Sequence, residues 1–225
     1  DGMRFVYSEG LDITGPSSDG DISTFEVIEE GENDDLDLES ADSDPDSDTL
    51  SLDEDDEQEY MIFAVDLSAE DSDNDISLDN LYFDVSVGGL VSVDSLVDDF
   101  RIEIDGESFD AESYNGSGSS TSGIQFDVDG DVEVPADDKV TVEFFANFND
   151  VSNSFDFATI TVSIDATTAD IDAEGADDLT TIGGSNQTGN IHNLRLKGVD
   201  DDLSSEDTTA DENNDASTSD DEGIF

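Results

Sequence analysis

Residues 140–148 read VTVEFFANF, and every second residue of this stretch, from Val140 to Phe148, is apolar. The same alternation runs through residues 61–67 (MIFAVDL) and 81–87 (LYFDVSV). A period of two is typical of β-strands that bury one face and expose the other. Shorter alternating runs follow the same rule, and no comparable stretch has helical spacing. The sequence therefore predicts strands throughout residues 60–165.

Turn residues separate these runs at intervals of about ten residues, which is typical of sandwiches and barrels. We therefore expect an all-β fold, an antiparallel β-sandwich of jelly-roll or immunoglobulin-like type with long acidic loops. Asp105-Gly106 and Asp129-Gly130 each stand between apolar runs, and Asp-Gly is a strong hairpin signal because both residues take positive φ. Gly88-Gly89 predicts a turn in the same way.

Two changes of parity interrupt the alternation. Leu78 and Leu81 are three residues apart, and another shift separates Phe157 from Ile160. One extra residue in a strand produces such a shift, so we expect a β-bulge between Leu78 and Leu81 and a bulge or bend near Ala158.

The composition restricts the function and the environment. The chain has 225 residues with 64 Asp and Glu, 5 Lys and Arg, no Cys and a formal net charge of −59. A nucleic-acid-binding protein needs Lys and Arg to neutralise phosphates, so no nucleic acid is expected as a partner. No apolar run approaches the roughly 18 residues of a membrane span, so none is expected. The absence of Cys excludes a disulfide framework.

The charge also predicts the solvent. Self-repulsion at this charge disfavours a compact state in dilute buffer, whereas the screening length falls to about 3 Å near 1 M salt. The Lys-poor, acidic surface resembles that of proteins from extreme halophiles, especially haloarchaea. A calcium-loaded extracellular protein from moderate salt is the alternative.

Acidic residues divide the chain into segments. Residues 29–59 hold 17 acidic residues among 31, and residues 200–222 hold 11 among 23. We predict four segments: an N-terminal strand or arm with the first strands (1–28), an acidic insertion or loop (29–59), a β-sandwich core (60–198) and an acidic tail (199–225). Within 29–59, two leucine pairs, Leu36/Leu38 and Leu50/Leu52, are compatible with short edge strands around Pro45.

Alternating aspartates are candidate calcium ligands, because Ca²⁺ takes six to eight oxygen ligands and a turn can direct several carboxylates to one point. None of the candidates has the spacing of an EF-hand loop, and Asp127–Asp131 is also explained by a hairpin. The three sets are Asp42, Asp44, Asp46 (with Asp48); Asp71, Asp73, Asp75; and Asp127, Asp129, Asp131. Calcium is the only cofactor expected.

Catalytic patterns are missing. His192 is the single histidine, so a zinc site lacks ligands and we interpret His192 as structural. The Gly116-x-Gly118 pair lies in a Ser-rich stretch and opens no helix, so it is interpreted as a loop. We expect no enzymatic activity. Asn115 and Asn186 begin Asn-x-Ser/Thr sequons in polar stretches and are candidate glycosylation sites.

The N-terminus predicts self-assembly. Met3, Phe5 and Tyr7 alternate around Arg4, which predicts a short strand. Such a strand can pair within its own sandwich or complete the sheet of a neighbouring copy. The partner expected here is a second copy of the chain, in a homopolymer.

Residues 134–136 (VPA), followed by residues 140–142 (VTV), form a loop that leads into a strand. This stretch, together with the alternating strand pattern of residues 60–165, resembles prokaryotic cell-surface β-sandwich proteins, including surface-layer domains and camelysin/TasA-like filament subunits. The resemblance implies an extracellular or cell-surface structural subunit that forms a pilus-like filament or a surface layer. Two alternatives stay open: a calcium-dependent adhesin or binding module, and a virion surface protein of a halophile virus.

Overall fold

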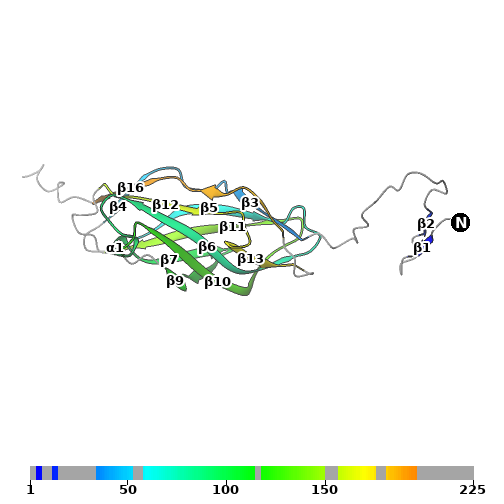
Figure 1. Ribbon diagram of the computed structural model, residues 1–225. Coiled ribbons are helices and arrows are strands. Elements are labelled where there is room, and N and C mark those ends of the chain that lie inside the picture. Colours follow the sequence, from blue (N-terminus) through cyan, green and yellow to red (C-terminus); the bar gives the residue numbers. More distant parts are fainter. Residues whose placement is uncertain are drawn as a thin grey trace, which may run out of the picture. The chain divides into compact units, whose positions relative to one another are not determined.

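The computed structural model describes residues 4–6, 12–14, 34–52, 58–114, 118–149, 157–175 and 181–196. The chain divides into two compact units, Asp1–Glu30 and Gly31–Phe225. In the first unit, β1 (Arg4–Val6) pairs antiparallel with β2 (Asp12–Thr14), and Phe5 is opposite Ile13 (Figure 1). The predicted strand at the N-terminus is therefore one arm of a small two-stranded sheet. Met3 and Tyr7 lie outside the described residues.

The second unit consists of two packed β-sheets (Figure 1). The first has the order β14 (Thr181–Gly184), β3 (Asp35–Ser40), β5 (Gln58–Ser68), β11 (Lys139–Phe148), β7 (Val97–Ile104), β8 (Glu107–Asp110). The second has the order β4 (Thr49–Leu52), β16 (His192–Leu196), β12 (Thr159–Ile164), β6 (Ile76–Gly88), β10 (Thr121–Val134), β9 (Ser113–Tyr114). In addition, β13 (Ile171–Glu174) pairs with β6, and β15 (Gln187–Thr188) pairs with β12.

This arrangement confirms the predicted all-β, sandwich-like fold. Most strand pairs are antiparallel, as expected, but β14 pairs parallel with β3 and β16 pairs parallel with β4, so both sheets are mixed. Both parallel pairs join strands that are far apart in sequence, as parallel pairing requires. From β3 to β7, consecutive strands alternate between the two sheets. An immunoglobulin domain differs, since its strands A and B share one sheet.

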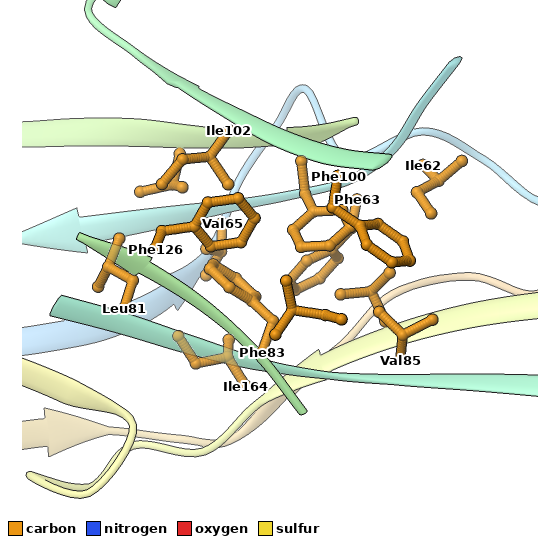
Figure 2. Close-up of a cluster of buried hydrophobic side chains, with 14 of the residues drawn as sticks. Ile62, Phe63, Val65, Leu81, Phe83, Val85, Phe100, Ile102, Phe126 and Ile164 are labelled. Atoms are coloured by element: carbon orange, nitrogen blue, oxygen red, sulfur yellow. The ribbon is translucent and has the colours of Figure 1, made fainter. Parts of the chain in front are cut away.

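The core lies between the sheets and is rich in phenylalanine (Figure 2). The ring of Phe83 on β6 lies 5.1 Å from Phe144, 5.8 Å from Phe126 and 6.3 Å from Phe63, measured between ring centroids. Phe63 and Phe144 belong to the sheet opposite Phe83, so this cluster joins the two layers. The residues that alternate with them on β6 and β11 face outward, as the period of two predicted. On β5, Ile62, Ala64 and Asp66 are buried as well, next to a change of register between Met61 and Phe63.

The turn predictions had different outcomes. Asp105 (φ 51°) and Gly106 (φ 83°) connect β7 to β8, which confirms that hairpin. The second Asp-Gly pair lies inside β10, where Gly130 has φ 72°, so the hairpin predicted there was wrong. Gly88-Gly89 ends β6 and leads toward the four-residue helix α1 (Val93–Leu96), not into a second strand.

The parity change in β6 is a bulge, as expected. Both β10 and β13 change register between Leu78 and Asn80 of β6, so Asp79 has no counterpart on β13. Near Ala158 the chain has the bend that was one of the two expected forms: Phe157 lies in a turn with φ 73°, and β12 begins at Thr159.

The predicted segment 29–59 contributes one strand to each sheet. β3 holds Leu36 and Leu38, and β4 holds Leu50 and Leu52, all four buried. The pairs are thus strands around the Pro45 loop, although only β4 is an edge strand, because β14 lies outside β3. The predicted tail at 199–225 lies outside the described residues.

Candidate functional site

The first feature of the site is a free sheet edge. β4 is the last strand of its sheet, and among the described residues no strand pairs with its outer side. The Asn193 N–H donates to the Asp48 carbonyl at 2.9 Å, which defines the side of β4 that faces β16. Because backbone groups alternate in direction along a strand, those of Thr49 and Ser51 point away from β16. The Thr49 N–H already donates to Asp48 Oδ1 at 2.7 Å, so an added strand could pair with the Thr49 carbonyl oxygen and the Ser51 N–H.

The second feature is the neighbouring part of β5. β3 pairs with β5 only from Val65 to Ser68, so residues 58–64 lack a described strand on that side. Side chains replace the missing strand: the Ala64 N–H donates to Asp44 Oδ1 at 2.9 Å, and His192 Nε2 lies 2.9 Å from the Ile62 carbonyl oxygen. These contacts keep the backbone of β5 satisfied where the sandwich is not closed by a strand.

A pocket of about 480 Å³ lies between these two features. Its wall includes the loop before β4, β4 itself, Tyr60 and Met61 of β5, and His192 of β16. The Tyr60 hydroxyl donates to the Ser51 carbonyl oxygen at 2.7 Å and so joins one sheet to the edge of the other. Asp46 and Asp48 make the wall acidic. The opening is therefore a crevice beside a free strand edge, with cation-attracting walls.

His192 is built into the wall of this crevice. It is 1% exposed, and its Nε2 must carry the proton, because its partner is a carbonyl oxygen, which only accepts. Its other ring nitrogen, Nδ1, is buried and has no hydrogen-bond partner within the described residues. The contact with Ile62 agrees with the structural role that we expected for His192.

Asp44 lies next to the crevice and has an unusual titration. Partial burial raises the pKa of Asp44 above its ordinary value, and Asp46 adds to this effect. The Ala64 N–H bond and the interaction with His192 act in the opposite direction. Through its bond from the Ala64 N–H, Asp44 caps the backbone of β5.

The three aspartate triplets lie in three separate places. Asp42, Asp44, Asp46 and Asp48 lie in the loop between β3 and β4; Asp71, Asp73 and Asp75 lie in the turn between β5 and β6; Asp127, Asp129 and Asp131 lie in β10 at its change of register. Within the residues that the structure describes, no group of three or more His, Asp or Glu side chains is arranged to hold a metal ion. Calcium binding stays a prediction.

Of the two sequon asparagines, Asn186 is exposed between β14 and β15, and its Oδ1 accepts a bond from the Ala166 N–H at 3.0 Å. Asn115 lies outside the described residues. In the described part of the chain, no helix is long and apolar enough to cross a membrane.

Sequence reasoning missed the roles of Tyr60, Ser51 and Asp44. Each role depends on a pairing between distant parts of the chain, above all β4 with β16, and no local sequence pattern predicts that pairing. The leucine alternation at Leu50 and Leu52 predicted the strand but not its partner.

Comparison with known proteins adds little. No protein-family model matches the chain, and no curated protein matches it. A solved structure described as manganese lipoxygenase of Gaeumannomyces graminis with part of zonadhesin of Komagataella pastoris is 12% identical, with a TM-score of 0.26. The similarity covers 64% of this chain and 47% of that one, so the chain spans about half the length of that structure. At this TM-score the similarity carries no argument about function.

Proposed function

We propose that the chain is an extracellular or cell-surface structural subunit, adapted to high salt, which polymerises into a filament or surface layer. Subunits join by β-strand addition: a strand of one copy pairs with the outer side of β4 in the next. The observation that carries the proposal is the free edge of β4 beside the open pocket. Unpaired strand edges recruit other strands, and main-chain hydrogen bonds then supply affinity.

The donor in this proposal is β1. An isolated two-stranded hairpin is marginal in water, and β1 and β2 have three residues each. When β1 leaves β2 and pairs with the edge of β4 in a larger sheet, the free energy gained therefore exceeds the free energy lost. Phe5 supplies an apolar side chain to the pocket of the neighbouring copy.

Charge favours the same pairing. Arg4 is one of five Lys and Arg residues in the chain. Arg101 and Lys139 already form ion pairs, with Glu59 and Asp66. Asp46 and Asp48 give this edge of the sheet a negative charge, which favours a donor strand that carries a cation, and β1 carries Arg4. A donor and an acceptor on different surfaces make a head-to-tail contact, which yields an open polymer where the rotation does not close.

Two changes test the two partners separately. Deletion of Asp1–Ser8 removes the donor and should leave a folded protomer that does not polymerise. Ser51→Pro removes the outward N–H of β4 and should also block polymerisation, since proline is tolerated only where no ladder bond is needed. A mixture of the two variants should give pairs but no polymer, because one lacks the donor and the other lacks the acceptor. Added to wild-type chains, either variant should bind at one end of a growing polymer and stop its growth there.

The measurements are electron microscopy and sedimentation in multimolar NaCl, with circular dichroism as the folding control. Normal polymers from the deletion variant would overturn the role of β1. A wild-type chain that stays monomeric at high concentration and high salt would overturn the proposed function.

A further inference from the structure

The outer face of the β4-containing sheet differs from the rest of this acidic protein. In its middle, Thr161 on β12 is opposite Ser86 on β6, and Ser86 is opposite Thr121 on β10. All three side chains point away from the core, because their neighbours along each strand are buried. Three adjacent strands thus present a row of hydroxyl groups to the solvent.

The rows on both sides continue the pattern. On one side, Thr159 is opposite Gly88 and Asn193, and Asn193 is opposite Thr49 on β4. On the other side, Asp84 is opposite Ser163 and Gly123. We call these three rows the hydroxyl face; across five strands they contain one carboxylate, Asp84.

The other sheet presents charge at the corresponding positions. Glu143 on β11 is opposite Glu103 on β7, and Glu39 lies on β3 next to Asp66 of β5, which is buried and paired with Lys139. Asp35 and Asp37 extend this acidity along β3. A second copy with a net charge of −59 is therefore repelled much less at the hydroxyl face than at the outer face of the other sheet.

Exposed apolar groups border the hydroxyl face. Ile191, just before β16, is 55% exposed, and Phe157, just before β12, is 69% exposed. The guanidinium carbon of Arg195 lies 3.6 Å from the centroid of the Phe157 ring, which holds a cation at this border. Phe157 also has φ 73°, a conformation that is rare for a bulky residue and often marks a functional position. Uncharged, partly apolar surface is typical of interface cores.

From these observations we propose that the hydroxyl face binds the same face of a second copy, in a two-fold contact separate from the β4 edge. Same-face residues in a sheet lie about 6.8 Å apart along a strand and about 4.8 Å apart across strands, so each covers roughly 33 Å². The ten positions of the three rows then cover on the order of 330 Å², against about 800 Å² per partner in a stable complex. The contact is therefore weak and reversible. It associates neighbouring polymers side by side and does not join subunits within one polymer.

Salt strengthens this contact, because the remaining repulsion between the two copies is electrostatic and is screened. The partner is the chain itself, since the face has neither the Lys and Arg that an acidic partner needs nor the carboxylates that a basic partner needs. Its single acid, Asp84, lies in the row farthest from Arg195.

The absence of cysteine permits a direct test. Thr161→Cys introduces one thiol near the centre of the face, and a two-fold contact brings it close to the same residue of the partner copy. In multimolar NaCl, a short bismaleimide should cross-link this variant several-fold more efficiently than Asn147→Cys, which carries its thiol on the outer side of β11. Equal cross-linking of the two variants would overturn the proposal.

A charge test makes the result independent of cross-linking chemistry. The double variant Thr161→Asp, Ser86→Asp should weaken the concentration-dependent association seen by sedimentation velocity, whereas Asn147→Asp should leave it unchanged. An equal effect of both would indicate general repulsion and overturn the proposal.

The Asp1–Ser8 deletion separates this contact from polymerisation: cross-linking through Thr161→Cys should persist in the deleted chain. Its loss would overturn a contact that is separate from strand addition.

Discussion

The hydroxyl of Tyr60 donates a 2.7 Å hydrogen bond to the backbone carbonyl of Ser51 and thereby connects the two sheets at the free edge of β4. It occupies an outward carbonyl that an added strand would otherwise use. The Tyr60 ring also packs edge-on against Phe148, at 6.1 Å between centroids. Tyr60 therefore both closes the sandwich and competes with strand addition.

We predict that Tyr60→Phe lowers the free energy of unfolding by about 1 kcal/mol, the usual net value of one hydrogen bond, because ring packing is retained. The same variant should polymerise faster, since the Ser51 carbonyl becomes free. Denaturant unfolding and light scattering measure the two effects. Tyr82→Phe, on β6 and three strands away from β4, is the control. Slower polymerisation of Tyr60→Phe would contradict a competing role.

The Glu59–Arg101 pair predicts a pH-dependent contribution to stability. Arg101 Nε and Nη2 lie 2.9 Å and 2.8 Å from the two carboxylate oxygens of Glu59, and the guanidinium covers the Phe145 ring at 4.2 Å. The hydrogen bonds from Arg101 lower the pKa of Glu59, with partial burial opposing them. A lowered folded-state pKa stabilises the protein above the unfolded pKa of about 4.3, and this contribution disappears as pH falls through the folded value.

We therefore expect Glu59→Gln to be less stable than wild type at pH 7, with a difference that vanishes in acid. Glu59 is 43% exposed, so solvent screening keeps the difference to about 1 kcal/mol or less. Thermal melts of both proteins between neutral pH and pH 3 would measure it. Glu103→Gln, whose carboxylate has one contact to Arg101 at 3.2 Å, should show a smaller effect. A difference that is constant with pH would contradict the assignment.

Salt should control stability throughout the chain. With a net charge of −59, lowering NaCl from multimolar to millimolar should reduce the melting temperature or loosen the fold, because repulsion is then unscreened. Circular dichroism in the presence of a chelator measures this, and sucrose at equal osmolality is the control for general solvent effects. A melting temperature that stays the same across this range would contradict adaptation to high salt.

Calcium binding at the aspartate triplets is the fourth prediction. Asp44 and Asp75 accept bonds from the N–H groups of Ala64 and Ala136, at 2.9 Å and 2.8 Å, and a bound calcium ion would compete with these bonds. After exhaustive chelation, calorimetry should give saturable binding, and replacement of a ligating aspartate by asparagine should weaken it. Heat without saturation would contradict a calcium site and would indicate only diffuse screening of the carboxylate charge by ions.

The two Asp-Gly pairs explain why sequence reasoning succeeded at one turn and failed at another. Both have the residues of a tight turn, and both glycines have positive φ. Residues 105–106 follow the end of β7, and the chain reverses direction there and returns as β8. Gly130 is instead one of four residues of β10, 128–131, that lie opposite Asp79 of β6 alone, and β10 continues past it to Val134. The local conformation was predictable, whereas its consequence depended on the partner strand.

The sequence by itself determined the all-β class, the inward and outward faces of strands such as β6 and β11, and the turn at Asp105-Gly106, because these follow from side-chain period and backbone sterics. Only the tertiary structure decided that β4 pairs with β16 and ends its sheet, that Tyr60 reaches Ser51, and that Thr161, Ser86 and Thr121 form one row. These relationships join residues up to about 140 positions apart, and long-range pairing is selected by packing of the whole core, not by any local pattern.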